Sequence, residues 1–253
     1  MKSFWKLFTG ILSRVLYTFT WLIILSICIE ELDVIPAIVA GFIIISVFLL
    51  IHVKFLLPKR WDCGRTKFVI PERIYFLILT ALILVLGDIF WIYHIKTSQS
   101  GFEEDSLPFM IFGIIAYPLI EEFGFRLWLQ SFLESKFNKM ISIGIVALIF
   151  ALFHKPEMPI PQLLSGILYG VVLVTTKSIW IPILLHLMHN AVLILSGKIE
   201  YVKEISFEMM DRQDNLNLTI AITLWVLSTL FVFQWIRWNK GKLITTHNNV
   251  YKK

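Results

Sequence analysis

Charged residues are scarce in this sequence. Only 16% of its 253 residues are Asp, Glu, Lys or Arg, whereas 57% are hydrophobic. Ordinary soluble domains contain about 25% charged and about 45–50% apolar residues. The composition excludes a soluble globular enzyme, a disordered protein and a nucleic-acid-binding protein, because most of the chain must be solvated by lipid. The net charge of +5 is therefore a signal of membrane topology.

Cysteine is nearly absent as well. The chain has two, Cys28 and Cys63, which form neither a C-x-x-C pair nor part of a zinc-finger-like Cys/His cluster. A disulfide framework is therefore not expected. The sequence also lacks H-E-x-x-H, G-x-S-x-G and the paired aspartates of intramembrane aspartyl proteases. Asp88 follows a lone glycine, and we expect it to have a packing or supporting role.

Long apolar runs are plentiful. They predict spans near 15–32, 35–57, 74–95, 107–133, 140–154, 162–176, 179–196 and 217–236. A transmembrane helix needs about 20 residues, so the fifth, sixth and seventh runs are short and are expected beside a cavity. The sequence thus predicts an all-α polytopic membrane protein. It would form one integral membrane domain over residues 1–253, with about eight transmembrane helices around a polar cavity.

Lys and Arg are distributed unevenly between the predicted connections. One set of connections, together with both ends of the chain, carries 17 of the 23, and the opposite set carries five. Because cytoplasmic loops are enriched in Lys and Arg, both termini are predicted to be cytoplasmic, which fits a bacterial inner membrane. The first run lacks a small-residue cleavage site and is interpreted as a retained helix. Residues 4–12 have an apolar stripe suited to the membrane interface.

Polar side chains inside the spans are few and clustered. A charge at the centre of a bilayer costs at least about 2.5–3.5 kcal/mol, so such residues point to function. In the fourth span, Glu122 and Arg126 are four residues apart and are expected to form an ion pair. Pro118 should loosen the preceding turn. A structural ion pair with Arg126 would explain the carboxylate of Glu122. It would not explain the second buried carboxylate, that of Glu121.

Histidines supply the other polar groups. His154 ends the fifth span, where it could simply cap a helix C-terminus. In the seventh span, His186 and Asn190 are four residues apart and share a face, with His189 beside them. Interhelical hydrogen bonding would explain one such residue, whereas three on one stripe favour a lined cavity. The role of His189 is left open, and Asp88 keeps the packing or supporting role expected above.

These residue types suit amide hydrolysis. A carboxylate with an imidazole can activate water, and His and Asn side chains can donate hydrogen bonds to an oxyanion. The same types would also hold zinc, through Glu121, His154 and His186. The spacing does not decide between these mechanisms, and no cofactor is firmly predicted.

Three motifs in order, E-E-x-x-x-R at 121–126, F-x-x-x-H at 150–154 and H-x-x-x-N at 186–190, resemble the CPBP family of CAAX proteases and bacteriocin-processing membrane proteins. The resemblance covers about 107–196 and implies an eight-helix intramembrane endopeptidase with a cavity open to the cytoplasm. It implies catalytic roles for Glu121, Glu122, His154, His186 and Asn190, with Arg126 as support. Glu121 would activate water, assisted by His154, and His186 and Asn190 would bind the oxyanion.

The family resemblance implies a membrane-associated peptide or protein as substrate, with or without a prenyl group, and no nucleic-acid partner. Two other functions remain open. One is a non-catalytic membrane protein that confers bacteriocin immunity or acts as a scaffold. The other is a proton-coupled transporter, since buried Glu and His also form proton relays. The absence of an internal repeat argues against the transporter.

Overall fold

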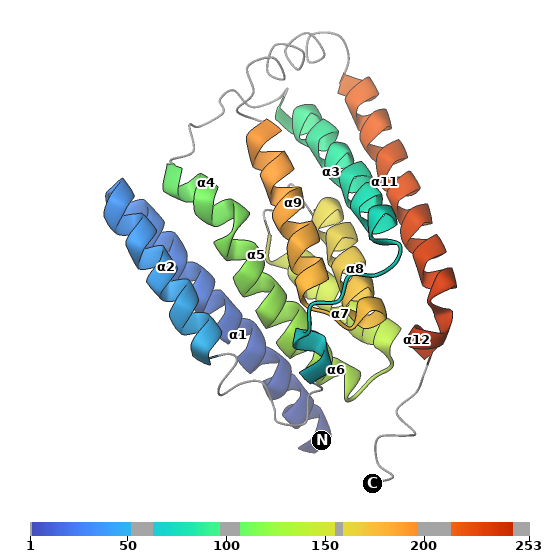
Figure 1. The fold of residues 1–253 in the computed structure, drawn as a ribbon, viewed down its shortest axis with the longest axis horizontal. Coiled ribbons are helices and arrows are strands. Elements are labelled where there is room, and N and C mark those ends of the chain that lie inside the picture. The colour runs from blue at the N-terminus through green and yellow to red at the C-terminus, as the bar shows by residue number, and fades with distance from the viewer. Residues whose placement is uncertain (1, 52–62, 97–106, 155–158, 197–213, 245–253) are drawn as a thin grey trace.

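The computed structural model describes residues 2–51, 63–96, 107–154, 159–196 and 214–244, and within these ranges every regular element is a helix (Figure 1). This confirms the all-α prediction. The end of the second predicted span and most of the acidic 197–214 connection lie outside the described residues. The elements are α1 (Lys2–Glu31), α2 (Val34–Ile51), η2 (Cys63–Thr66), α3 (Ile74–Lys96), α4 (Leu107–Ile114), α5 (Ala116–Glu121), η3 (Glu122–Gln130), α6 (Ser131–Glu134), α7 (Lys139–Leu152), α8 (Pro159–Thr176), α9 (Trp180–Ser196), α11 (Asp214–Trp238) and α12 (Lys240–Ile244).

Six helical segments are long and apolar enough to cross a membrane. They are Phe4–Glu31, Val34–Ile51, Ile74–Ile92, Leu107–Glu134, Pro159–Thr176 and Asn215–Trp238, and two shorter apolar helices are Lys139–Leu152 and Trp180–Ser196. The chain is therefore a polytopic membrane protein, and the eight segments match the predicted spans in position. That all eight cross the membrane stays a prediction.

One predicted span is longer than expected. The sixth was expected to begin near residue 162 and to be short, but α8 begins at Pro159 and has 18 residues. Pro159 and Pro161 lie in its first turn, where no helical hydrogen bond is lost because the first N–H groups have no partner within the helix. Proline thus starts this helix and does not shorten it.

The helices run in alternating directions through the bundle (Figure 1). At one end, the backbone N–H of Ile179 donates to the Arg65 carbonyl, and the Trp180 indole donates to the Thr66 carbonyl. At the same end, the Arg73 guanidinium lies over the Trp238 ring. These segments belong to the Lys- and Arg-rich set of connections. Their assignment to the cytoplasm stays a prediction.

The first helix continues through the predicted interfacial segment. α1 has 30 residues, about 45 Å at 1.5 Å per residue, which exceeds the roughly 30 Å of bilayer hydrocarbon. Its N-terminal half is attached to α6 and η3 through Arg14. The Arg14 guanidinium lies 3.9 Å from the centre of the Phe132 ring and 5.0 Å from that of Trp128. This contact fixes α1 against the segment that carries the catalytic candidates.

The fourth predicted span is not a single α-helix. It is divided at Ile115 into α4 and α5, and it continues as the nine-residue π-helix η3 and the short α6. Pro118 explains the division at Ile115, because its ring has no N–H to donate to the Ile114 carbonyl and clashes with it. π-Helical turns are rare and occur frequently at functional sites. Glu121 ends α5 and Glu122 begins η3, so both carboxylates lie at the change of helix type.

α7 and α8 approach each other closely at Gly166. A Cβ atom at Gly166 would lie 3.0 Å from the Cα of Ala147, a backbone atom that cannot move without shifting α7. Small residues allow such approach between membrane helices. We expect Gly166→Ala to lower the free energy of unfolding in detergent by about 1–3 kcal/mol through overpacking.

Gly144 on the same helix pair provides the matched control. A Cβ there meets no atom within 4 Å, so Gly144→Ala should leave stability unchanged or raise it by up to about 1 kcal/mol. Equal stability of the Gly166→Ala variant and the wild type would show that the helices separate at no cost.

Candidate active site

Two adjacent carboxylates form the centre of the site. Glu122 is fully buried and Glu121 is 8% exposed. Glu122 Oε2 lies 3.5 Å from Arg126 Nε, which confirms the predicted ion pair. Glu121 does not share this cation directly and faces two imidazoles. The two glutamates therefore have different partners, as their positions one residue apart on a helix predict.

His186 connects the two glutamates. Its Nδ1 donates a hydrogen bond to Glu122 Oε1 at 2.9 Å, and its Nε2 lies 3.6 Å from Glu121 Oε2. The ring stacks on Tyr169 of α8, with ring centres 4.8 Å apart and planes 25° apart. A hydrogen bond at one ring nitrogen sets what the other can do. Glu122 thus orients His186 so that Nε2 faces Glu121.

His154 contributes from just beyond the end of α7. Its Nδ1 donates to the Phe150 carbonyl at 2.6 Å, four residues earlier, so it does bond to the end of its own helix. Its Nε2 lies 3.9 Å from Glu121 Oε1. The capping and catalytic interpretations of this residue are therefore compatible, since each uses a different nitrogen. His154 and His186 face different oxygens of the same carboxylate.

Asn190 lies one turn beyond His186 on α9. Its side-chain amide donates to the Gly113 carbonyl of α4 at 2.9 Å, and it makes no hydrogen bond to Glu121 or His154. The bond to Gly113 uses one of the two N–H groups of the amide. The structure therefore unites five of the six candidates directly and holds Asn190 beside them with one donor left.

Sequence reasoning missed Tyr169, and it named Phe150, Asp88 and His189 without predicting their contacts. The Tyr169 ring covers His186, as described above. The phenyl ring of Phe150 lies under the Arg126 guanidinium, 4.9 Å from ring centre to Cζ. His189 Nε2 pairs with Asp88 Oδ2 of α3 at 3.0 Å. Phe150 stood in a motif and could have been suspected, whereas no sequence spacing relates Asp88 to His189.

The residues proposed as zinc ligands do not converge in this structure. Three ligands about 2.0–2.2 Å from one tetrahedral ion lie about 3.4 Å from each other. Here the two imidazole nitrogens lie 3.6 and 3.9 Å from different oxygens of Glu121. Among the described residues, no group of three His, Cys, Asp or Glu is placed to hold a metal ion. The donor types suit zinc, but their arrangement does not fit it.

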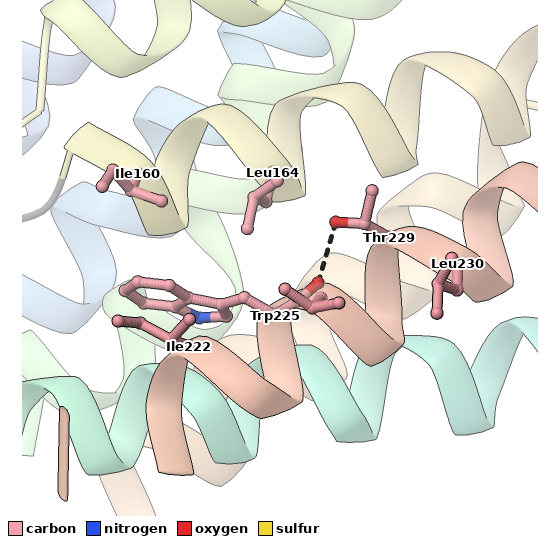
Figure 2. A pocket seen from close by; sticks show the side chains of 7 residues that line it. Ile160, Leu164, Ile222, Trp225, Thr229 and Leu230 are labelled. Carbon is pink, nitrogen blue, oxygen red and sulfur yellow. Dashed lines mark hydrogen bonds between the residues drawn. The ribbon is translucent and has the colours of Figure 1, made fainter. Parts of the chain in front are cut away.

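An apolar groove lies apart from the polar cluster, between α8 and α11 (Figure 2). Its volume is about 380 Å³ and its lining contains a single polar side chain, Thr229. The Thr229 hydroxyl donates to the Trp225 carbonyl of its own helix at 2.8 Å. This groove has no group for acid–base chemistry.

Comparison with protein families gives one match. Residues 103–192 match the family model described as type II CAAX prenyl endopeptidase Rce1-like. The match contains all the candidate residues and nearly coincides with the motif core expected at 107–196. No curated protein and no solved structure matches the chain.

Proposed function

Because residues 103–192 relate the chain to the type II CAAX prenyl endopeptidases, we propose that it is an intramembrane endopeptidase that hydrolyses a peptide bond with an activated water. The observation that carries this proposal is the buried carboxylate of Glu121, which faces an imidazole nitrogen with each of its oxygens. A structural ion pair does not require this surplus carboxylate.

Glu121 is the general base of the proposed reaction. Its oxygens lie 3.6 and 3.9 Å from the two Nε2 atoms, distances that suit polar groups bridged by a water. A water held there loses a proton to Glu121 as it attacks the substrate carbonyl, and the carboxyl then gives this proton to the leaving amine. The bond from His154 Nδ1 to Phe150 leaves its Nε2 able to accept a hydrogen bond from the same water.

His186 and Asn190 stabilise the oxyanion in this proposal. The donors are the second N–H of the Asn190 amide and, once the ring has taken up a proton, the Nε2–H of His186. Glu122 and Arg126 hold His186 in place.

The proposed substrate is a membrane-associated peptide or protein, and a prenylated C-terminal segment is the finer form of this proposal. It rests on the match to the CAAX prenyl endopeptidases. A bacterial inner membrane with both termini in the cytoplasm is proposed from the Lys and Arg distribution. The non-catalytic alternative, an immunity or scaffold protein, predicts that substitutions at the glutamates leave the phenotype intact. The transporter alternative predicts a proton flux that Glu121→Gln blocks.

The test compares membranes that carry the wild type with membranes that carry Glu121→Ala at matched expression. Peptide termini mapped by mass spectrometry should include some that occur only with the wild type. Such termini would identify substrate and cleavage site together. Identical termini, with both proteins inserted and the full set of membrane proteins present, would favour the immunity or scaffold function.

Removal of metal ions provides a separate prediction. Because the candidate zinc ligands do not converge, dialysis of the purified protein against a strong chelator should change the initial cleavage rate by less than about twofold. The measurement is the rate before and after dialysis, with a zinc-dependent protease treated in parallel as the positive control. A loss that added zinc restores would contradict the glutamate-only mechanism.

A further inference from the structure

A second buried polar chain meets α9 beside the active-site cluster. Asp88 of α3 accepts a hydrogen bond from Trp225 Nε1 of α11 at 2.8 Å, and its Oδ2 lies 3.0 Å from His189 Nε2 of α9. The three residues are at most 5% exposed. The chain thus joins three helices through one carboxylate, and its end on α9 lies three residues from His186 and one from Asn190.

The local sequence is adapted to this contact. A Cβ atom at Gly87 would lie 2.7 Å from Cδ1 and 2.8 Å from Nε1 of Trp225, so only glycine lets the indole reach the neighbouring Asp88. α3 and α11 lie side by side along their lengths (Figure 1). An apolar residue at position 88 would pack these helices without the cost of desolvating a carboxylate. The pair with His189 therefore needs a reason other than packing.

Rotation of α9 supplies that reason. His186 is held by Glu122 from η3, and His189 is held by Asp88 from α3. Two carboxylates on two different helices thus hold two imidazoles one turn apart on α9. A catalytic set must be held within about 0.5 Å and 10–20°, and a displacement of about 1 Å can cost about 100-fold in rate. With the contact to Asp88 removed, α9 loses one of the polar contacts that fix its rotation about its own axis.

We infer that Asp88 and His189 are positioning residues for the proposed hydrolysis. Their contact sets the rotation of α9 and with it the direction in which His186 Nε2 and the Asn190 amide face the substrate carbonyl. The Trp225 indole holds the Asp88 carboxylate in the orientation that His189 requires. The inference rests on the proposed function, and none of the three residues touches the reacting atoms.

The first experiment measures kinetics on a synthetic peptide that spans a cleavage site mapped with the wild type. Asp88→Asn should lower kcat about 10- to 100-fold and change KM less than about twofold. The double variant Asp88→Asn/His189→Gln should lose no more than the larger single loss, because both changes break one interaction. Trp225→Phe keeps an aromatic ring but removes the hydrogen-bond donor to Asp88. Its loss of kcat should therefore be smaller than that of Asp88→Asn. Thr229→Val, one turn along α11, is the control and should match the wild type.

The second experiment does not depend on catalysis. The chain has six histidines, and their ring ¹⁵N signals can be recorded with His186→Gln as the assignment variant. Asp88→Asn should shift the His186 signals, whereas Thr229→Val should not. A wild-type kcat for Asp88→Asn, a change in KM alone, or unchanged His186 signals would overturn the inference. Full cleavage by Glu121→Gln would instead overturn the proposed function, and the ¹⁵N signals would still decide whether Asp88 orients α9.

Discussion

Replacing Glu121 by glutamine will lower kcat/KM for peptide cleavage by about 10³-fold, within the roughly 10²–10⁴-fold that a general base contributes. Glutamine keeps the size and the hydrogen-bonding reach of the side chain, but it cannot take a proton from water. Because Glu121 is almost fully buried, the loss of its charge should not reduce stability. The measurement is the initial rate of the purified protein in liposomes, with thermal unfolding recorded on the same preparation.

Glu31→Gln is the matched control, because Glu31 is an exposed glutamate at the end of α1. It should cleave at the wild-type rate. Cleavage within tenfold of wild type by a folded Glu121→Gln protein would remove Glu121 from the role of base. A loss of rate that accompanies a large loss of stability would assign Glu121 to the structure of the site and not to its chemistry.

Arg126→Met should destabilise the protein by about 3–5 kcal/mol, the cost of leaving one partner of a buried ion pair uncompensated. Arg126 is fully buried, and its nearest acidic atom is Glu122 Oε2 at 3.5 Å. Methionine retains much of the apolar stem of the arginine but not the guanidinium that lies over Phe150. The free energy of unfolding in mixed detergent micelles is the quantity to measure.

A second substitution separates charge from packing. Glu122→Gln/Arg126→Met removes both charges, and a glutamine oxygen can still accept the hydrogen bond from His186 Nδ1. The double variant should therefore recover most of the stability that Arg126→Met loses. If the losses of the two single variants simply add, Glu122 and Arg126 do not act as a pair.

Sequence patterns located the helices well because the length and the apolar content of each run can be read directly from the sequence. The eight predicted runs all correspond to helices, and the ion pair between Glu122 and Arg126 follows from their spacing. The π-helix was not predicted, because an apolar run has the same sequence pattern whether its backbone hydrogen bonds span four residues or five. Pro118 indicated a weakened turn but not the different helix that follows it.

Contacts between helices were the part that the sequence could not supply. Trp225 and His189 meet at Asp88 from positions more than a hundred residues away, and periodicity within one helix gives no information about its neighbour. For the same reason Tyr169 was overlooked as the ring that stacks on His186. The family resemblance placed Glu121, His154 and His186 in one site, and the structure brings these three side chains together, while their catalytic roles stay a prediction.

The nine π-helical residues of η3 make the length of this segment as important as its composition. A π-turn closes its hydrogen bond over one residue more than an α-turn, so a chain one residue shorter here could return to α-helix. The residues within 122–130 would then turn by about 100° each, more than in a π-helix, so the faces that they present would change. Homologous sequences aligned across 122–130 should therefore tolerate exchanges of apolar residues more readily than a single gap. In this stretch the number of residues therefore determines the structure as much as their chemical type does.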